Sequence, residues 1–206
     1  MLDARLRRVI DPPLKAAAGS LVRAGLGADA VTVLGFAVGL LAMAAIALGH
    51  SALGLVLFLL NRLADGLDGA VARQTRLTDR GGFLDIVLDF ILYSGIVFAF
   101  ALRDPAQDAL AAAFLIFSFV GTGTSFLAFA IMAAKRGLSS EARGRKSLYY
   151  LGGLTEGTET ILCFAVLCLW PAAFAPVAWG FGALCWVTTA ARILTGVRAL
   201  RATRAL

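Results

Sequence analysis

Long apolar runs follow one another along the chain, each close to the length that a helix needs to cross a lipid bilayer. A bilayer core takes about 20 apolar residues per helix, and lipid offers backbone N–H and C=O groups no partner outside their own helix. Hydrophobic residues make up 60% of the 206 residues, and charged residues only 16%. We therefore predict an all-α integral membrane protein with about six transmembrane helices and no separate soluble domain. The predicted spans are residues 31–49, 52–73, 82–102, 108–134, 148–169 and 173–198.

The first 25 residues are charged and interrupted by two prolines, which is unlike a cleavable signal peptide. Apolar residues from Leu14 to Val22 recur at helical spacing, and Lys15 and Arg23 fall outside that apolar stripe. Such a pattern is typical of a helix that lies in the membrane interface. We predict a cytoplasmic interfacial amphipathic helix region at residues 1–25 and a six-helix membrane domain at residues 26–206.

The formal net charge of +6 is distributed unevenly along the chain. The links at residues 50–51, 103–108 and 171–172 contain one basic residue, Arg103, whereas the other links and both termini contain nearly all the rest. Basic residues collect on the cytoplasmic side of membrane proteins. We therefore expect both termini in the cytoplasm, as an even number of spans requires. This bias explains the charge better than nucleic-acid binding does, and the abundance of Arg, Ala and Gly indicates a bacterial protein of the inner membrane.

Four aspartates interrupt the second and third predicted spans near their cytoplasmic ends. Asp65 and Asp68 are three positions apart, and Asp85 and Asp89 are four apart, so each pair projects from a single helix face. The turn between the two spans is short enough to make the helices antiparallel neighbours. The two pairs of carboxylates can therefore face each other as one cluster.

Such a cluster needs positive charge, because one charged side chain at the bilayer centre costs about 2.5–3.5 kcal/mol on insertion scales. Carboxylate oxygens are hard ligands that select Mg²⁺, Mn²⁺ or Ca²⁺ over soft metals. Four carboxylates exceed what one Mg²⁺ usually takes from protein, so we predict two ions with shared carboxylates, or one structural and one catalytic ion.

Interhelical ion pairs are the alternative explanation for the aspartates. The candidate pairs are Arg62 with Asp65 or Asp68, and Arg73 with Asp85 or Asp89. Two arginines cannot neutralise four aspartates, and ion pairing would not explain a glycine on the carboxylate face. Metal binding is therefore favoured.

The residues that follow Asp65 are suited to hold a phosphate group. Gly69 lies one turn beyond Asp65 on the same face, and without a side chain it lets a phosphate lie against the helix. Gly66 and Ala72 keep the neighbouring surface low, and Arg73 can donate forked hydrogen bonds to phosphate oxygens. The pattern indicates a metal site for chemistry on a phosphate-bearing substrate.

The spacing of these residues resembles the signature of the CDP-alcohol phosphatidyltransferases, a family of integral membrane phospholipid synthases. The matching pattern is Asp65-x2-Asp68-Gly69-x2-Ala72-Arg73-x7-Gly81-x3-Asp85-x3-Asp89. The gap before Gly81 is one residue shorter than is common in the family. That difference shortens a loop and leaves the helical faces unchanged.

This resemblance implies a metal-dependent transfer of a phosphatidyl or similar phospho-lipid group to a hydroxyl acceptor, with release of CMP. The donor would be a CDP-linked lipid such as CDP-diacylglycerol, the cofactor Mg²⁺ or Mn²⁺, and the enzyme often a homodimer. Asp65, Asp68 and Asp85 would ligate metal, and Asp89 would ligate metal or act as the base on the acceptor hydroxyl. The CDP moiety would be held by Asp65, Asp68, Gly69, Ala72 and Arg73.

The acceptor site must come from other spans, and two polar features compete for it. Glu156 and Glu159 lie on one face of the fifth predicted span, among hydroxyl groups that suit an uncharged polyol or a cationic head group. Lys135, at the start of a basic link, and Arg192, inside the last span, would instead suit a phosphorylated acceptor such as glycerol phosphate or inositol phosphate. The positive-inside bias also explains the basic link, and an ion pair with either glutamate also explains Arg192. The acceptor's identity stays open.

Two other functions are compatible with an aspartate cluster in a membrane. An intramembrane prenyltransferase also holds Mg²⁺ with aspartate-rich helices, but such enzymes usually have more spans and two separated aspartate motifs. A divalent-cation carrier would need polar groups along the whole path, whereas the non-cytoplasmic halves of the spans are almost wholly apolar. The sequence supports both of these functions less well than it supports phosphatidyl transfer.

Overall fold

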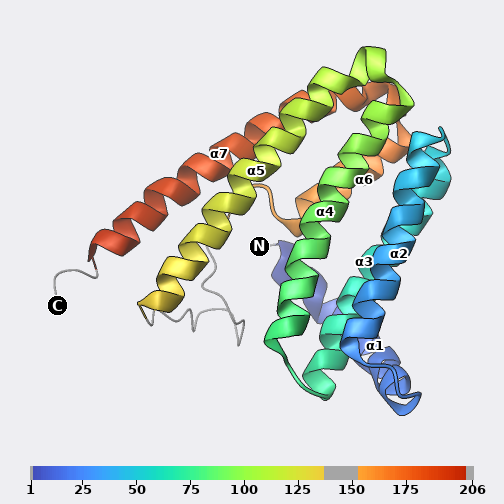
Figure 1. The fold of residues 1–206 in the computed structure, drawn as a ribbon, viewed down its shortest axis with the longest axis vertical. Coiled ribbons are helices and arrows are strands. Elements are labelled where there is room, and N and C mark those ends of the chain that lie inside the picture. The colour runs from blue at the N-terminus through green and yellow to red at the C-terminus, as the bar shows by residue number, and fades with distance from the viewer. Residues whose placement is uncertain (1, 137–152, 203–206) are drawn as a thin grey trace.

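The computed structural model describes residues 2–136 and 153–202, and this part of the chain contains helices and no strand (Figure 1). The prediction of an all-α integral membrane protein is confirmed. The helices are α1 (Leu2–Arg23), α2 (Ala28–Ala47), α3 (Ser51–Gln74), α4 (Asp79–Arg103), α5 (Pro105–Lys135), α6 (Gly157–Leu169), the short 3-10 helix η2 (Pro171–Ala173) and α7 (Phe174–Ala202).

Four helical segments within the described residues are long and apolar enough to cross a membrane: α2, α4, α5 and the segment Pro171–Arg201 that contains α7. The helix α3 has 24 residues, but Arg62 lies at its middle and the first aspartate pair lies in its second half. The helix α6 has only 13 residues and is about 20 Å long, short of the roughly 30 Å of a bilayer core.

The predicted fifth span, 148–169, is therefore too long as a helix. Residues 148–152 lie outside the described residues, and α6 begins only at Gly157 because Glu156 and Glu159 form a capping box there. The carboxylate of Glu159 accepts a hydrogen bond from the backbone N–H of Glu156 at 3.1 Å. Reciprocal bonds of this kind satisfy the free N–H groups of a first turn and mark where a helix starts.

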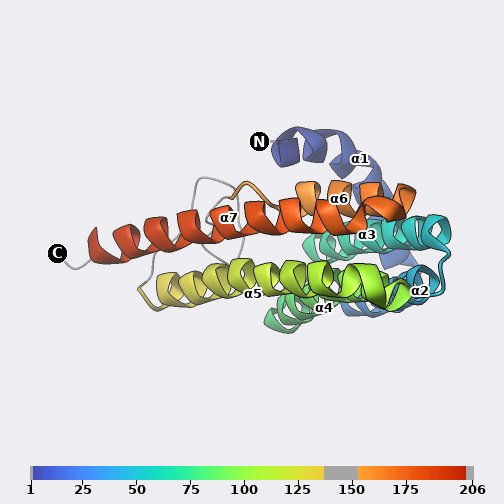
Figure 2. The ribbon, with the colours of Figure 1, turned by 90° about the horizontal axis from the view of Figure 1, so that it is seen from above.

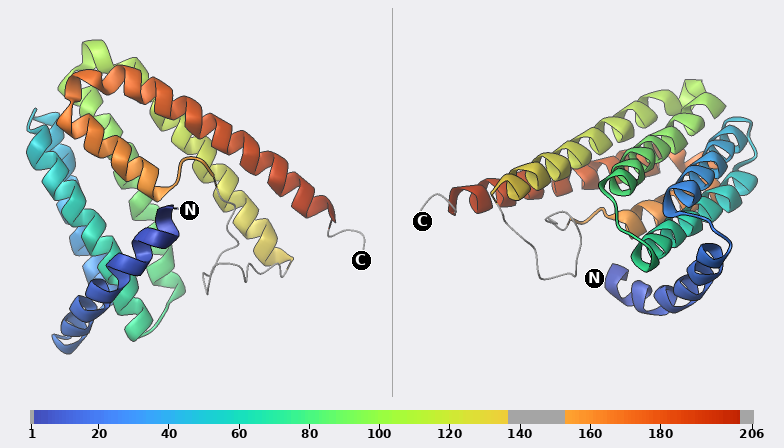
Figure 3. Two further views of the ribbon diagram at one scale, coloured as in Figure 1. Left: turned by 180° about the vertical axis from the view of Figure 1, so that it is seen from behind. Right: turned by 60° about the horizontal axis from the view of Figure 1, so that its bottom comes forward.

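The helix α1 lies across one end of the bundle, packed on the last turns of α3 (Figures 1 and 3). Ala18 of α1 is fully buried against Ala70 and Val71 of α3. The side-chain amide of Gln74 donates to the carbonyl of Lys15 at 2.8 Å. This packing agrees with the predicted apolar stripe from Leu14 to Val22, and its place in the membrane interface stays a prediction.

The helices α2, α3 and α4 pack together around small residues and a shared core. A Cβ at Gly35 of α2 would lie 2.7 Å from the Cβ of Ala64 on α3, so the two helices approach more closely than larger residues allow. The main hydrophobic core includes buried Phe58 of α3, Leu92 of α4 and Phe164 of α6.

The long helices α5 and α7 run side by side and lean away from the other helices (Figures 1 and 2). They meet α4 and α6 at the upper end of Figure 1 and diverge from them toward the lower end. At the upper end, the guanidinium of Arg103 binds both the carboxylate of Asp108, at 3.3 Å, and the carbonyl of Pro171, at 3.1 Å.

Candidate active site

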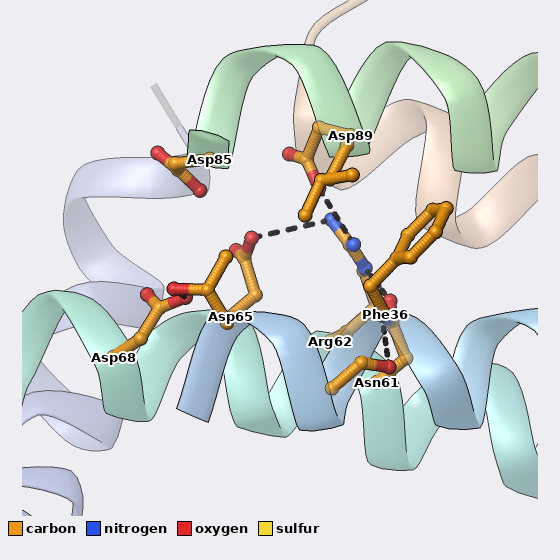
Figure 4. Close-up of a pocket in the computed structure, with 10 residues that line it drawn as sticks. Phe36, Asn61, Arg62, Asp65, Asp68, Asp85 and Asp89 are labelled. Carbon is orange, nitrogen blue, oxygen red and sulfur yellow. Dashed lines mark hydrogen bonds and ion pairs between the residues drawn. The ribbon is translucent and has the colours of Figure 1, made fainter. Parts of the chain in front are cut away.

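The second half of α3 and the first half of α4 face each other, and both helices pack against α2. Their carboxylates point into the space between them (Figure 4). Oxygen atoms of Asp65, Asp85 and Asp89 all lie within 4.8 Å of one another. Residues 75–78 form the short turn between the helices, and Thr78 caps α4 by accepting a hydrogen bond from the N–H of Gly81 at 3.0 Å. The two aspartate pairs face each other as predicted, but α3 and α4 make their main contacts with α2 and not directly with each other.

Asp68, the fourth aspartate, makes a separate contact. Its side chain is buried, 6% exposed, and its Oδ2 accepts a 2.6 Å hydrogen bond from the hydroxyl of Thr32 on α2. Asp68 also lines the pocket between the helices together with Asp65 and Asp85. Sequence reasoning missed Thr32, although it is a polar residue within an apolar span.

Arg62 reaches the cluster from the same helix as Asp65. Its Nη2 lies 2.7 Å from Oδ1 of Asp89, and its Nη1 lies 3.8 Å from Oδ1 of Asp65. The alternative pairing of Arg62 with Asp65 is therefore present, although the shorter pair joins Arg62 to Asp89. One guanidinium cannot balance three converging carboxylates.

The three converging carboxylates of the cluster are suited to bind a divalent cation. The three converging groups are all carboxylates on two helices, and hard oxygen ligands of this kind bind Mg²⁺ or Mn²⁺. A bound cation would also offset the repulsion among like charges held this close. Asp65, Asp85 and Asp89 are thus positioned so that they could hold such a cation, and Asp68 lines the same pocket.

The small residues of α3 that were expected to border the phosphate do not all lie in the same surroundings. Gly69 is near Arg73, whose Nη1 would lie 3.2 Å from a Cβ at Gly69; Arg73 itself is exposed at the end of α3. Ala72 is half-buried. Gly66 was expected to keep the phosphate surface low, but it faces α1, where a Cβ would lie 3.1 Å from Leu14. Gly66 therefore serves helix packing.

A cavity of about 290 Å³ opens between α4, α5, α6 and α7, next to the carboxylate cluster. Asp85 and Asp89 line its near side, and Glu156 and Arg192 line it as well. Arg192 is 8% exposed, donates to the carbonyl of Thr122 at 3.1 Å and lies over the ring of Phe126. Two of the four predicted acceptor residues, Glu156 and Arg192, thus line the same cavity as two of the aspartates.

The other two predicted acceptor residues have different surroundings. Glu159 caps α6 through the backbone of Glu156, and Lys135 is exposed at the end of α5. Tyr93 was not predicted, yet it lines the cavity and its hydroxyl accepts a 2.9 Å hydrogen bond from Arg62. The sequence could have indicated Tyr93 as a site residue, because it lies one turn beyond Asp89 on the same helix.

Comparisons with known proteins agree with this geometry. The family model described as CDP-alcohol phosphatidyltransferase matches residues 26–198. A relative from Escherichia coli (strain K12), named inner membrane protein YnjF, is 53% identical over 201 residues, which cover 98% of each chain. An archaetidylinositol phosphate synthase from Pyrococcus horikoshii is 31% identical over 99 residues, which are 48% of this chain and 53% of that one.

Two solved structures share the fold. Both are Mycobacterium tuberculosis phosphatidylinositol phosphate synthase (PgsA1). The structure with CDP-DAG bound has a TM-score of 0.64 at 23% identity and covers 89% of this chain and 92% of that one. The structure with manganese and citrate has a TM-score of 0.66 at 22% identity and covers 89% and 88%. With the family model spanning most of the chain, this protein belongs to the CDP-alcohol phosphatidyltransferase family.

Proposed function

We propose that this enzyme transfers a phosphatidyl or similar phospho-lipid group from a CDP-linked lipid, such as CDP-diacylglycerol, to a hydroxyl acceptor and releases CMP. One observation carries the proposal: three carboxylates converge within 4.8 Å between α3 and α4, beside a cavity that two of them line. This arrangement would put a metal site for the donor next to a space for the acceptor. The CDP-DAG in the related synthase structure supports the choice of donor.

Asp65, Asp85 and Asp89, with Asp68 at the edge, would hold Mg²⁺ or Mn²⁺, and four carboxylates favour two ions over one. A divalent ion at this place would make the pyrophosphate electrophilic and stabilise the leaving phosphate. The manganese in a related structure supports the choice of metal. Gly69, Ala72 and Arg73, on the same helix as Asp65, would hold the CDP moiety.

The proposed reaction breaks one bond and forms one. The acceptor oxygen attacks the phosphorus that bears the lipid, and the bond from that phosphorus to the bridging oxygen breaks, so that CMP leaves with that oxygen. Asp89 belongs to the carboxylate cluster and also lines the cavity, and it would take the proton from the acceptor hydroxyl as general base.

The acceptor would enter the cavity that Glu156 and Arg192 line. Arg192 favours a phosphorylated acceptor, whereas Glu156 and the hydroxyls of Thr122, Thr155 and Thr160 favour an uncharged polyol or a cationic head group. Lys135 stands at the exposed end of α5, where it would meet an acceptor only at the entrance. Glu159 would act through the cap that it forms with Glu156.

The carboxylate cluster would face the cytoplasm, where the nucleotide part of the donor and the acceptor are in water while the lipid tails stay in the bilayer. The turn after α3 and the basic ends of α5 and α7 lie at the same end of the molecule as the aspartates (Figure 1), and basic ends favour the cytoplasmic side. The name of the E. coli relative supports the inner membrane. Both termini would be cytoplasmic, and the apolar faces of α5 and α7 would allow a homodimer.

The test is to incubate the purified protein with CDP-diacylglycerol, Mg²⁺ or Mn²⁺, and a panel of acceptors: glycerol phosphate, inositol phosphate, serine and free polyols. CMP and a new phospholipid are expected with one of them. Pyrophosphate from a prenyl pyrophosphate instead would indicate a prenyltransferase, and metal flux into liposomes would indicate a carrier. No CMP with any acceptor would contradict the proposal.

A further inference from the structure

Arg62 lies outside the aspartate signature, yet it forms a short ion pair with Asp89 inside the site. Its side chain is 9% exposed, and its Nη2 binds Oδ1 of Asp89 at 2.7 Å. A charge-assisted hydrogen bond of this length, shielded from water, is strong. One of the two carboxylate oxygens of Asp89 is therefore already bound by the protein (Figure 4).

The guanidinium of Arg62 is itself fixed by three further contacts. Its Nε donates to Oδ1 of Asn61 at 2.8 Å, and its Nη1 donates to the hydroxyl of Tyr93 at 2.9 Å. Its planar group also lies 5.0 Å from the ring centre of Tyr93, close enough for a cation–π interaction. The amide of Asn61 in turn donates to the carbonyl of Gly35 at 2.8 Å. These bonds link α2, α3 and α4 through one arginine.

We infer that Arg62 is a positioning residue for Asp89: it holds Oδ1 so that Oδ2 alone serves the metal site or the acceptor hydroxyl. The inference rests on the proposed function, because it assigns a task to the proposed base. A carboxylate held by one oxygen presents the other in a single direction, as a general base needs for proton transfer. Arginine suits the task because it donates in several fixed directions at once, whereas a lysine is a single point charge.

The first test measures Mn²⁺ binding to the purified protein by electron paramagnetic resonance, which needs no acceptor. Arg62→Gln removes a positive charge beside the carboxylates and frees Oδ1 of Asp89, so Mn²⁺ should bind about tenfold more tightly. When Asp89→Asn is already present, Arg62→Gln should tighten Mn²⁺ binding much less. The factor should be at least about threefold smaller than in the protein that keeps Asp89, because the two residues act as a pair. A residue that only supports the fold would weaken Mn²⁺ binding when removed.

The second test uses Arg62→Lys and the acceptor that releases CMP from CDP-diacylglycerol in the panel above. Lysine keeps the charge, so Mn²⁺ affinity should stay near that of the unchanged protein. The kcat should fall about a hundredfold with the KM for CDP-diacylglycerol little changed, because the transition state has lost an oriented base. Arg103→Gln is the matched control: it removes the arginine of α4 that pairs with Asp108 of α5, at the opposite end of the bundle, and should leave kcat unchanged.

Three results would overturn the inference: weaker Mn²⁺ binding in Arg62→Gln, equal tightening with and without Asp89, or full kcat in Arg62→Lys. If Arg62→Gln does not fold, the kcat and Mn²⁺ affinity of Arg62→Lys still decide whether Arg62 positions Asp89. If the unchanged protein releases no CMP with any acceptor, the proposed function fails, while the Mn²⁺ measurements still decide whether Arg62 and Asp89 act as a pair.

Discussion

The hydroxyl of Thr32 on α2 donates a 2.6 Å hydrogen bond to the carboxylate of Asp68 on α3, across 36 positions of sequence. This bond gives Asp68 a partner that differs from those of the other three aspartates. Asp65, Asp85 and Asp89 converge on one point, whereas Asp68 has one oxygen occupied by Thr32. The four aspartates therefore have unequal surroundings before any ligand binds.

Thr32→Val should leave the carboxylate of Asp68 without its hydroxyl donor. Loss of a partner for a buried charged group costs about 1–3 kcal/mol, so we expect a lower unfolding temperature in detergent and weaker Mn²⁺ binding. Thr32→Ser keeps the hydroxyl and is the matched control. Equal Mn²⁺ affinity in the valine and serine variants would show that Thr32 does not orient Asp68.

Asp89→Asn should abolish CMP release while the protein still folds and binds CDP-diacylglycerol. The amide keeps the shape of the side chain but is no longer a base. Asp65→Ala should instead lower Mn²⁺ affinity, because it removes a ligand outright. Binding of CDP-diacylglycerol, measured by isothermal titration calorimetry, separates the two cases. Retained turnover in Asp89→Asn would exclude Asp89 as the base.

Gly69→Ala should impair donor binding without unfolding the protein. The new Cβ would lie 3.2 Å from the end of the flexible Arg73 side chain, which can move aside, and alanine is the better helix former. We expect the KM for CDP-diacylglycerol to rise roughly tenfold, which corresponds to about 1.4 kcal/mol. Gly82→Ala, where a Cβ would meet nothing within 4 Å, should leave KM unchanged. An unchanged KM in both variants would remove Gly69 from the donor site.

Gly35→Ala should destabilise the bundle. Its Cβ would lie 2.7 Å from the Cβ of Ala64, so α2 and α3 would have to move apart, and overpacking of this kind costs about 1–3 kcal/mol. The measurement is thermal unfolding in detergent. Gly180→Ala on α7, where a Cβ meets nothing within 4 Å, should unfold at the same or a higher temperature. Equal stability of the two variants would contradict the close packing of α2 on α3.

Glu156→Gln tests the acceptor site. Its carboxylate accepts a hydrogen bond from the N–H of Gly153 at 2.9 Å, and glutamine can keep this bond while losing the charge. We expect α6 to remain intact, as judged by an unchanged unfolding temperature. A changed KM for the acceptor, with the KM for CDP-diacylglycerol constant, would place Glu156 beside the acceptor. Unchanged values of both would restrict Glu156 to its capping role.

Local spacing was enough to predict the facing aspartates, because residues three or four apart share a helix face and a short turn makes consecutive helices neighbours. It could not predict the bond from Thr32 to Asp68, which depends on how α2 packs against α3. The late start of α6 was readable in principle, since Glu156 and Glu159 have the spacing of a capping box, but the apolar run that follows suggested a longer span. The disfavoured ion-pair alternative paired Arg62 within its own helix, and only the position of α4 opposite α3 shows that Asp89 lies closer than Asp65.

The central claim is that an acceptor hydroxyl attacks the phosphorus that bears the lipid, with Asp89 at the reacting centre. The most direct measurement supplies CDP-diacylglycerol, Mn²⁺ and the active acceptor with ¹⁸O in its reacting hydroxyl, and locates the label by mass spectrometry. The account predicts ¹⁸O in the new phospholipid, unlabelled CMP, and neither product with Asp89→Asn. Label in CMP, or an equal yield of labelled phospholipid from Asp89→Asn, would contradict it.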